Sequence, residues 1–303
     1  MSETLHPLRR AIGWRHILLI AAGLTAAVVG ILGVHTVGRL QGWFIERTSP
    51  EELSALLSPG YIVAKPPGDG PFPTALLYHG CDGLKDNMDR WTEALVASGW
   101  AAIVVDSHGP RGYADDASWR LVCTGQLLPG PERAGDVLVS MADAARMPFV
   151  DPDRLALVGM SHGGWTIMEL LALAPPAALP VNLAAMPRSL SGLDGVVAAV
   201  LVYPWCGLAN RARFDGWDHD APVLFVLAEL DVIAPAFECE LLAGTLEAMG
   251  RNVEVTMHEG VTHGFDQEER AVGSILVYDA EATAASIARS MEFLDAAIAP
   301  DPS

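Results

Sequence analysis

The feature that most limits the fold is a series of short apolar runs that alternate with helical stretches along most of the chain. Runs that are apolar at nearly every position are typical of strands covered on both faces, and helices between them are typical of βαβ units. The alternation predicts one three-layer α/β domain, with a mostly parallel sheet and helices on both faces. The expected strands are residues 61–65, 74–78, 101–106, 155–159, 196–203, 223–228 and 253–258, and the expected helices are residues 87–98, 132–145, 162–173, 236–249 and 278–298.

A separate apolar segment lies near the N-terminus. No Lys, Arg, Asp or Glu occurs between Arg15 and Arg39, and residues 17–37 would form a helix about 31 Å long, which matches one bilayer core. Arg9, Arg10 and Arg15 precede this run and predict a cytoplasmic N-terminus, with everything after the run across the membrane. We therefore expect one N-terminal transmembrane helix, a signal anchor; secretion after signal cleavage is the alternative.

These patterns divide the chain into four regions. Residues 1–16 are expected to form a basic cytoplasmic N-terminus, residues 17–37 the anchor, residues 38–58 a linker with a short helix, and residues 59–300 the α/β domain. The linker helix is expected to begin at Ser49-Pro-Glu-Glu52, which supplies a capping serine, a first-turn proline and a glutamate at the capping-box position.

The net charge of −18 limits the partners of the chain. The first 47 residues carry five Arg and two Glu, or +3, so the rest of the chain carries −21. Such an acidic domain would repel a phosphate backbone, and we expect no nucleic-acid partner. The four cysteines are scattered and form no C-x-x-C motif, which argues against a zinc site. Neither charge nor cysteine spacing indicates an oligomeric state.

The segment Gly159-Met-Ser161-His-Gly163 stands between an apolar strand and a helix. In a G-x-S-x-G turn of this kind the serine Oγ is exposed at the carboxyl end of the sheet, and the glycines leave room for a tight backbone. The helix that follows directs its first N–H groups and its positive dipole end at developing negative charge. This placement indicates that Ser161 is a nucleophile.

A serine nucleophile requires a base and an orienting acid, here in the chain order Ser, acid, His. His263 is the expected base, because a loop that leaves the carboxyl edge of the sheet can carry an imidazole over the serine; His258, at the end of the last strand, is the alternative. Asp231 and Glu229 both follow the strand at residues 223–228. Asp231 lies further into the loop and is the expected acid, with Glu229 as the alternative.

An oxyanion hole needs two hydrogen-bond donors. The backbone N–H of His162, the residue after the nucleophile, is one candidate. The backbone N–H of Cys81, in the loop that follows an earlier strand, is the other, and Gly80 and Gly83 allow that loop to approach a substrate closely. The side chains of His79 and His162 are expected to be structural.

Seven motifs then occur in a fixed order, and with them the chain resembles the dienelactone hydrolase-like branch of the α/β-hydrolases over about residues 61–298. The resemblance implies an α/β-hydrolase fold, no metal, no cofactor and a triad of Ser161, Asp231 and His263. Dienelactone hydrolases use a cysteine nucleophile and are typically cytoplasmic, so Ser161 and the anchor are departures from the family. The motifs are His79-Gly-Cys-Asp-Gly83, Asp106-Ser-His-Gly-Pro-Arg-Gly112, Arg133-Ala-Gly-Asp136, Gly159-Met-Ser-His-Gly-Gly164, Tyr203-Pro-Trp-Cys206, Glu229-Leu-Asp231 and Thr262-His-Gly-Phe265.

A catalytic domain outside the cytoplasm would allow disulfides to persist. We expect Cys206 to pair with Cys239 and to brace the acid loop, because Cys206 follows a strand end and Cys239 lies just beyond Asp231. Cys81 with Cys123 is the second expected pair. Buried unpaired cysteines are the alternative.

Two charged motifs have open roles. Arg133 and Asp136, three residues apart, are expected to form an ion pair on a helix surface or at the base of a loop, with substrate binding as the alternative. Arg111 is either a ligand for a substrate carboxylate or a structural tie.

The expected function is hydrolysis of a small-molecule carboxylic ester or lactone through an acyl-enzyme intermediate. Nothing in the sequence fixes the leaving group, so a peptidase or a thioesterase with the same triad is an alternative. A non-catalytic, membrane-tethered binding module is the alternative from another class.

Overall fold

A computed structural model describes residues 13–113, 116–270 and 273–299 of the chain. Its strands form one sheet in the order β1-β3-β2-β4-β5-β6-β7, with β1 antiparallel to β3 and every other neighbouring pair parallel. The predicted mostly parallel α/β sheet is confirmed. The strands are β1 (Tyr61–Ala64), β2 (Phe72–Tyr78), β3 (Ala101–Val105), β4 (Val150–Met160), β5 (Val196–Val202), β6 (Val223–Ala228) and β7 (Val253–His258).

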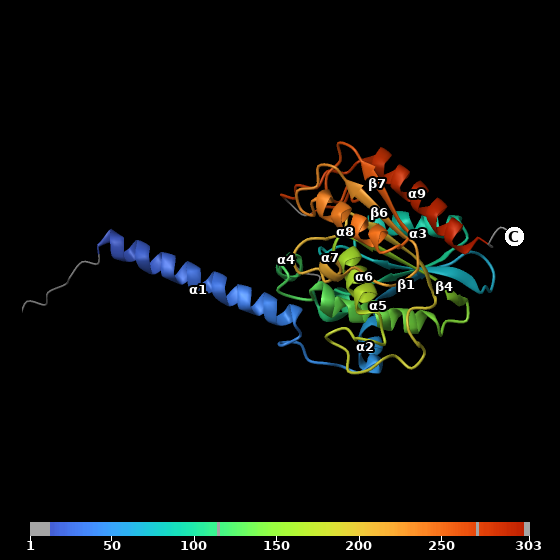
Figure 1. Ribbon diagram of the computed structural model, residues 1–303, viewed down its shortest axis with the longest axis horizontal. Helices are drawn as coiled ribbons and strands as arrows, with labels where there is room; N and C mark the ends of the chain where they lie inside the picture. The colour runs from blue at the N-terminus through green and yellow to red at the C-terminus, as the bar shows by residue number, and fades with distance from the viewer. Residues whose placement is uncertain (1–12, 114–115, 271–272, 300–303) are drawn as a thin grey trace, which may run out of the picture.

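Nine α-helices lie in the described residues (Figure 1). They are α1 (Trp14–Leu40), α2 (Pro50–Leu57), α3 (Asn87–Ala97), α4 (Asp116–Cys123), α5 (Gly130–Ala144), α6 (His162–Leu173), α7 (Ala212–Asp215), α8 (Ala236–Ala248) and α9 (Ala280–Ile298). Neither α4 nor α7 was predicted from the sequence, because eight and four residues are too few to display a helical period. Two 3₁₀ turns, Ser58–Gly60 and Gly109–Arg111, complete the helical elements.

The helices cover both faces of the sheet. Helices α2, α5, α6 and α8 contribute buried side chains to a hydrophobic cluster on one face, and α3 and α9 contribute to a cluster on the other. Alternate strand residues enter opposite clusters, as Leu76 and Leu77 of β2 do. Because every strand from β2 to β6 supplies both clusters, its buried residues are apolar at nearly every position.

Strand β4 is longer than the sequence predicted, since it begins at Val150 rather than at Leu155. Its first residues pair with β2 across a register shift between Phe72 and Thr74. Pro152 is exposed at this irregular end, where a missing N–H costs the sheet little.

The N-terminal helix α1 is longer than the predicted 17–37 and stands apart from the packed domain (Figure 1). It is long and apolar enough to cross a membrane, and its most apolar window has no buried residue. Residues 1–12, with Arg9 and Arg10, lie outside the described residues.

Helix α2 begins with the expected capping box. The Glu52 N–H donates to Ser49 Oγ at 3.2 Å, and the Ser49 N–H donates to Glu52 Oε2 at 2.9 Å. Leu53 and Leu57 are buried in the cluster that α5 shares. The short helix expected in residues 38–58 is therefore present and packs against the domain.

Candidate active site

The turn between β4 and α6 holds Ser161 in a strained backbone conformation. Its φ of 52° and ψ of −110° are rare for a residue with a side chain, and strain of this kind concentrates at functional sites. The flanking glycines make the turn sterically feasible: a Cβ on Gly159 would lie 2.6 Å from the Gly163 carbonyl carbon, and a Cβ on Gly163 would lie 2.1 Å from the Tyr78 oxygen. The Ser161 N–H donates to the Val202 carbonyl of β5 at 2.8 Å, which fixes the turn against the neighbouring strand.

Two loops at the carboxyl ends of β6 and β7 bring Asp231 and His263 to this serine. His263 Nε2 lies 2.8 Å from Ser161 Oγ, and His263 Nδ1 lies 2.6 Å from Asp231 Oδ2. Asp231 is held in turn, because its Oδ1 accepts the N–H groups of Ile233 at 2.9 Å and Ala234 at 2.7 Å. Asp231 and His263 are buried, so water competes little for these hydrogen bonds.

The alternative acid and base lie elsewhere. Glu229 is exposed, and its Oε2 accepts the Gly260 N–H at 2.8 Å. His258 Nε2 lies 2.7 Å from Ser286 Oγ of α9. The geometry therefore favours Asp231 and His263 over Glu229 and His258.

Tyr203 is a further component of the site that was not assigned from the sequence. Its ring packs edge-on against His263, with centroids 4.7 Å apart, and its hydroxyl donates to the buried carboxylate of Asp266. Trp91 Nε1 also donates to Asp266, at 2.8 Å. The available signal was position, because Tyr203 directly follows β5 just as Ser161 follows β4.

The loop after β2 passes close to Ser161. A Cβ on Gly80 would lie 3.8 Å from Ser161 Cβ. His79 Nδ1 lies 2.7 Å from the Gly80 carbonyl oxygen, while His79 Nε2 accepts the Ser107 N–H at 3.2 Å, so Nδ1 carries the proton and donates to Gly80. In a trans peptide the C=O and the next N–H point in opposite directions, so this hydrogen bond also sets the direction of the Cys81 N–H.

The second candidate donor lies at the start of α6. Ser161 is the N-cap and His162 the first helical residue, so the His162 N–H is one of the donors that the helix itself leaves unbonded. The positive end of the helix dipole adds to the field at this position.

A buried arginine, Arg133, holds both segments that carry the candidate oxyanion donors, the loop at His79 and the start of α6. Arg133 Nη1 donates to the His79 carbonyl at 2.8 Å and to His162 Nδ1 at 3.0 Å, and its Nε donates to Ser107 Oγ at 3.0 Å. Burial lowers the pKa of Arg133 to about 10, against the opposing effect of Asp136, so the group stays charged at neutral pH. Burial and then the Arg133 charge lower the pKa of His162, which keeps that imidazole neutral.

The expected Arg133–Asp136 ion pair was wrong. Asp136 instead binds Arg111 through two hydrogen bonds of 2.7 and 2.9 Å, and Arg111 also donates to the Ser107 carbonyl at 2.8 Å. The three-residue spacing on α5 was misleading because Arg133 donates its hydrogen bonds to His79, Ser107 and His162 and not to Asp136. Arg111 is thus a structural tie between loop and helix.

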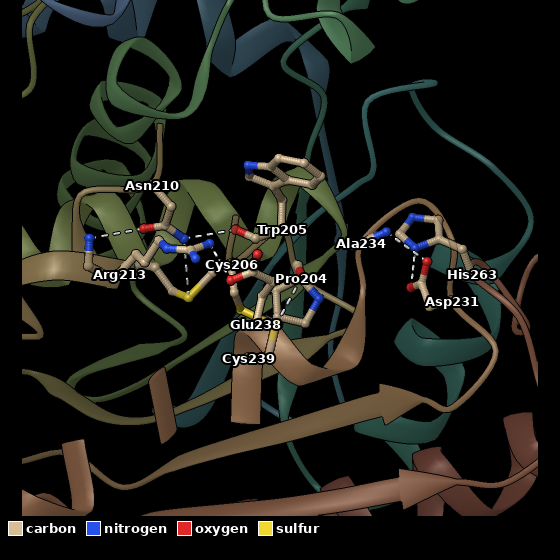
Figure 2. The surroundings of a disulfide bond; sticks show 12 residues. Pro204, Trp205, Cys206, Asn210, Arg213, Asp231, Ala234, Glu238, Cys239 and His263 are labelled. Carbon is tan, nitrogen blue, oxygen red and sulfur yellow. Dashed lines mark hydrogen bonds and ion pairs between the residues drawn. A yellow bond between two sulfur atoms is a disulfide. The ribbon is translucent and has the colours of Figure 1, made fainter. Parts of the chain in front are cut away.

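Two disulfides flank the site. Cys206, in the loop after β5, is bonded to Cys239 of α8, close to the Asp231–Ala234 turn (Figure 2). Cys81, a candidate oxyanion donor through its N–H, is bonded to Cys123 at the end of α4. Each disulfide therefore joins a loop of the site to a helix.

A pocket of about 930 Å³ opens at these groups, at the upper end of the range for small-molecule sites. Its lining includes Cys81, Ser161, His162 and His263, with walls from α4, from residues 273–276 and from the end of α1. Among the described residues, no group of three or more His, Cys, Asp or Glu is arranged to hold a metal ion.

Comparison with known proteins shows which family this chain resembles. The model of the dienelactone hydrolase family matches residues 183–298, which confirms the resemblance that the motifs indicated. The chain is 25% identical over 231 residues to a putative carboxymethylenebutenolidase of Aquifex aeolicus, covering 70% of this chain and 83% of that protein.

It is also 28% identical over 215 residues to the acylamino-acid-releasing enzyme of Arabidopsis thaliana, covering 63% of this chain but only 27% of that protein. Among solved structures, Thermogutta terrifontis esterase 2 phosphorylated by paraoxon shares the fold, with a TM-score of 0.61 and 16% identity over 80% of this chain and 90% of that one.

Proposed function

We propose that this dienelactone hydrolase-like chain is a membrane-anchored serine hydrolase that cleaves a carboxylic ester or lactone through an acyl-enzyme intermediate. The observation that carries the proposal is the continuous hydrogen-bonded series from Ser161 Oγ through His263 to Asp231. A free serine hydroxyl is a weak nucleophile, and a base in hydrogen-bond contact activates it.

In the proposed reaction, Ser161 Oγ attacks the ester carbonyl carbon while His263 Nε2 takes the hydroxyl proton. The bond to the alcohol then breaks, and His263 returns the proton to the leaving oxygen. Water repeats these steps on the acyl-enzyme and releases the acid. Asp231 holds the imidazole in the required tautomer and stabilises the imidazolium without taking the proton.

The N–H groups of Cys81 and His162 are proposed to bind the oxyanion of the tetrahedral intermediate. Loss of one such donor costs about 3–4 kcal/mol in other hydrolases, so the orientation of this loop carries much of the rate. The charged Arg133 behind His79 and His162 supports a site that favours negative charge.

Peptide cleavage is the second candidate function. It is favoured by the similarity to an acylamino-acid-releasing enzyme, of whose length this chain spans about a quarter. Turnover of a p-nitrophenyl ester and of the matching p-nitroanilide separates the two, since a peptidase accepts an amine leaving group and an esterase strongly prefers the alcohol.

We also propose that α1 is an uncleaved anchor, with residues 1–16 in the cytoplasm and residues 59–300, with α2 packed on them, as an extracytoplasmic catalytic domain. The most apolar stretch of α1 has no residue buried against the domain, and a lipid bilayer is an environment that would cover it. Specific packing of its last turn supports retention over cleavage: Arg39 pairs with Glu132 of α5, and Leu40 packs on the core. A mature chain about forty residues short would overturn this topology.

Ser161→Ala tests the function directly. We expect turnover of a short p-nitrophenyl ester to fall by at least about 10⁴-fold and covalent labelling by a fluorophosphonate to disappear, with an unchanged melting temperature. Ser189→Ala, at an exposed position outside the pocket, is the matched control. If the fluorophosphonate fails to label the wild-type protein, the chain is a binding module and not a serine hydrolase.

A further inference from the structure

The end of the membrane helix forms part of the pocket wall. Thr36 and Leu40 of α1 line the same cavity as Ser161 and His263. An anchor that serves only as a tether has no reason to reach the catalytic pocket.

Specific contacts fix the direction in which α1 leaves the domain. Gln126 bonds to His35 Nδ1 at 3.1 Å and to the Thr36 hydroxyl. The Phe44 ring folds back on α1, where a Cβ on Gly38 would lie 2.1 Å from it. Figure 1 shows α1 leaving the domain on the side where α4 and α5 lie. The bilayer around α1 and the pocket therefore have a set orientation.

The length of α1 indicates where its pocket-lining residues lie relative to the bilayer. If residues 17–37 span the hydrocarbon core, Thr36 lies at its boundary and Leu40 about 4.5 Å beyond Val37. This is the level of the lipid headgroups. Trp43, exposed to 68%, follows directly, and exposed tryptophan is typical of that level.

The pocket rim carries apolar side chains that water does not favour. Leu208, Ile233 and Ile275 line the pocket and are exposed to 72%, 41% and 63%. Single exposed apolar residues are ordinary on protein surfaces, but several around one opening mark a contact surface. Trp165 and Trp205 add further apolar surface to the lining of the same pocket.

We propose that the pocket opens toward the bilayer that holds α1, and that its substrate is a carboxylic ester whose acyl chain resides in the adjacent lipid monolayer. The rim would contact the lipid, and the acyl chain would pass from lipid to the apolar lining without crossing water. This inference rests on the proposed function and names its substrate class. The reaction is unchanged: ester and water give a fatty acid and an alcohol.

The test uses the full chain in phosphatidylcholine vesicles and two esters. 4-Methylumbelliferyl palmitate is placed either in the vesicles that hold the protein or in separate vesicles, and p-nitrophenyl acetate is supplied in water. We expect palmitate hydrolysis to be at least about tenfold faster within the shared bilayer, because confinement raises the effective concentration.

Two variants locate the effect. Leu208→Gln with Ile275→Gln should lower the ratio of palmitate to acetate turnover at least about fivefold, since both substitutions remove apolar surface that the lipid and the acyl chain would cover. Leu241→Gln, on α8 and equally exposed at 63% but outside the pocket, should leave the ratio unchanged.

Hydrolysis of acetate with equal palmitate rates in shared and separate vesicles would overturn the inference and leave the proposed function standing. Hydrolysis of neither ester would overturn the proposed function itself.

Discussion

Cys81 and Cys123 are disulfide-bonded, so the loop that offers a candidate oxyanion donor is joined covalently to the helix that walls the pocket. Cys123 is exposed, whereas Cys206 and Cys239 are each 1% exposed. The two disulfides thus differ in what they hold and in how easily a reductant reaches them.

Loss of the Cys81–Cys123 disulfide should impair catalysis more than binding. We expect Cys81→Ala with Cys123→Ala to lower kcat for a soluble ester about tenfold with little change in KM, because the Cys81 N–H loses its fixed orientation. Cys206→Ala with Cys239→Ala is the control, and its main effect should be a stability loss of up to about 4 kcal/mol. Steady-state kinetics and thermal unfolding of both variants check this; equal kcat in the first variant and the wild type would contradict it.

Asp231 and Glu229 form a matched pair two residues apart. Asp231→Asn should lower kcat by about 10⁴-fold, since the amide stabilises neither the correct tautomer nor the imidazolium. Glu229→Gln keeps an oxygen to accept the Gly260 N–H and should leave kcat within about twofold of the wild type, because surface changes of this kind are nearly neutral. Comparable losses in both variants would refute the assignment of the acid.

His79 is a positioning residue in this arrangement, since it acts on the Cys81 N–H through the Gly80 carbonyl. His79→Leu removes the donor to Gly80, and kcat should fall about 10- to 100-fold at unchanged KM. This is less than the roughly 10²- to 10³-fold loss for an oxyanion donor removed outright, because the Cys81 N–H stays in the site. His79→Asn retains a side-chain N–H near the position of Nδ1 and should recover most of that loss. Without recovery, a general packing defect explains the leucine variant better. His258→Leu, outside the site, serves as the control.

Glu169 should make stability depend on pH. Burial raises its pKa to about 7 from 4.5, although the N–H groups of Arg211 and Trp165 oppose the shift. The folded state therefore binds more protons than the unfolded state between these pH values, and stability is lost as the pH rises through 7, by about 3 kcal/mol in all. Glu169→Gln removes this loss.

The corresponding measurement is denaturant unfolding of the detergent-solubilised chain at pH 5 and pH 8.5. From pH 5 to pH 8.5, the free energy of unfolding should fall by about 3 kcal/mol more in the wild type than in Glu169→Gln. A pH-independent difference would mean that Glu169 is ionised in the folded protein throughout.

Local patterns were sufficient for the sheet and for the residues that meet at its edge. Each strand from β2 to β6 carries an apolar run that supplies both clusters, so its core could be predicted without tertiary information, whereas the first residues of β4 could not. The proximity of Ser161, Asp231 and His263 followed from one rule, that parallel strands end at the same edge. Their catalytic roles remain proposals.

Both expected disulfides are present, but hydrogen bonds between buried polar side chains of distant segments could not be predicted. Arg133 reaches His79 and His162, which lie 54 and 29 residues away, and nothing in its own segment indicates this. Helix α4 is too short to show a period, and its position is set by the bond from Cys123 to Cys81. The approach of α1 to the pocket depends equally on side chains from distant segments.

The last turn of α1 has a practical consequence for any soluble fragment of this protein. A fragment that starts after Gln41 lacks Thr36 and Leu40, and its cavity has one side open to water. It also leaves Glu132 without the guanidinium of Arg39. Kinetic constants measured on such a fragment would describe a substrate pocket that differs from the pocket of the full chain.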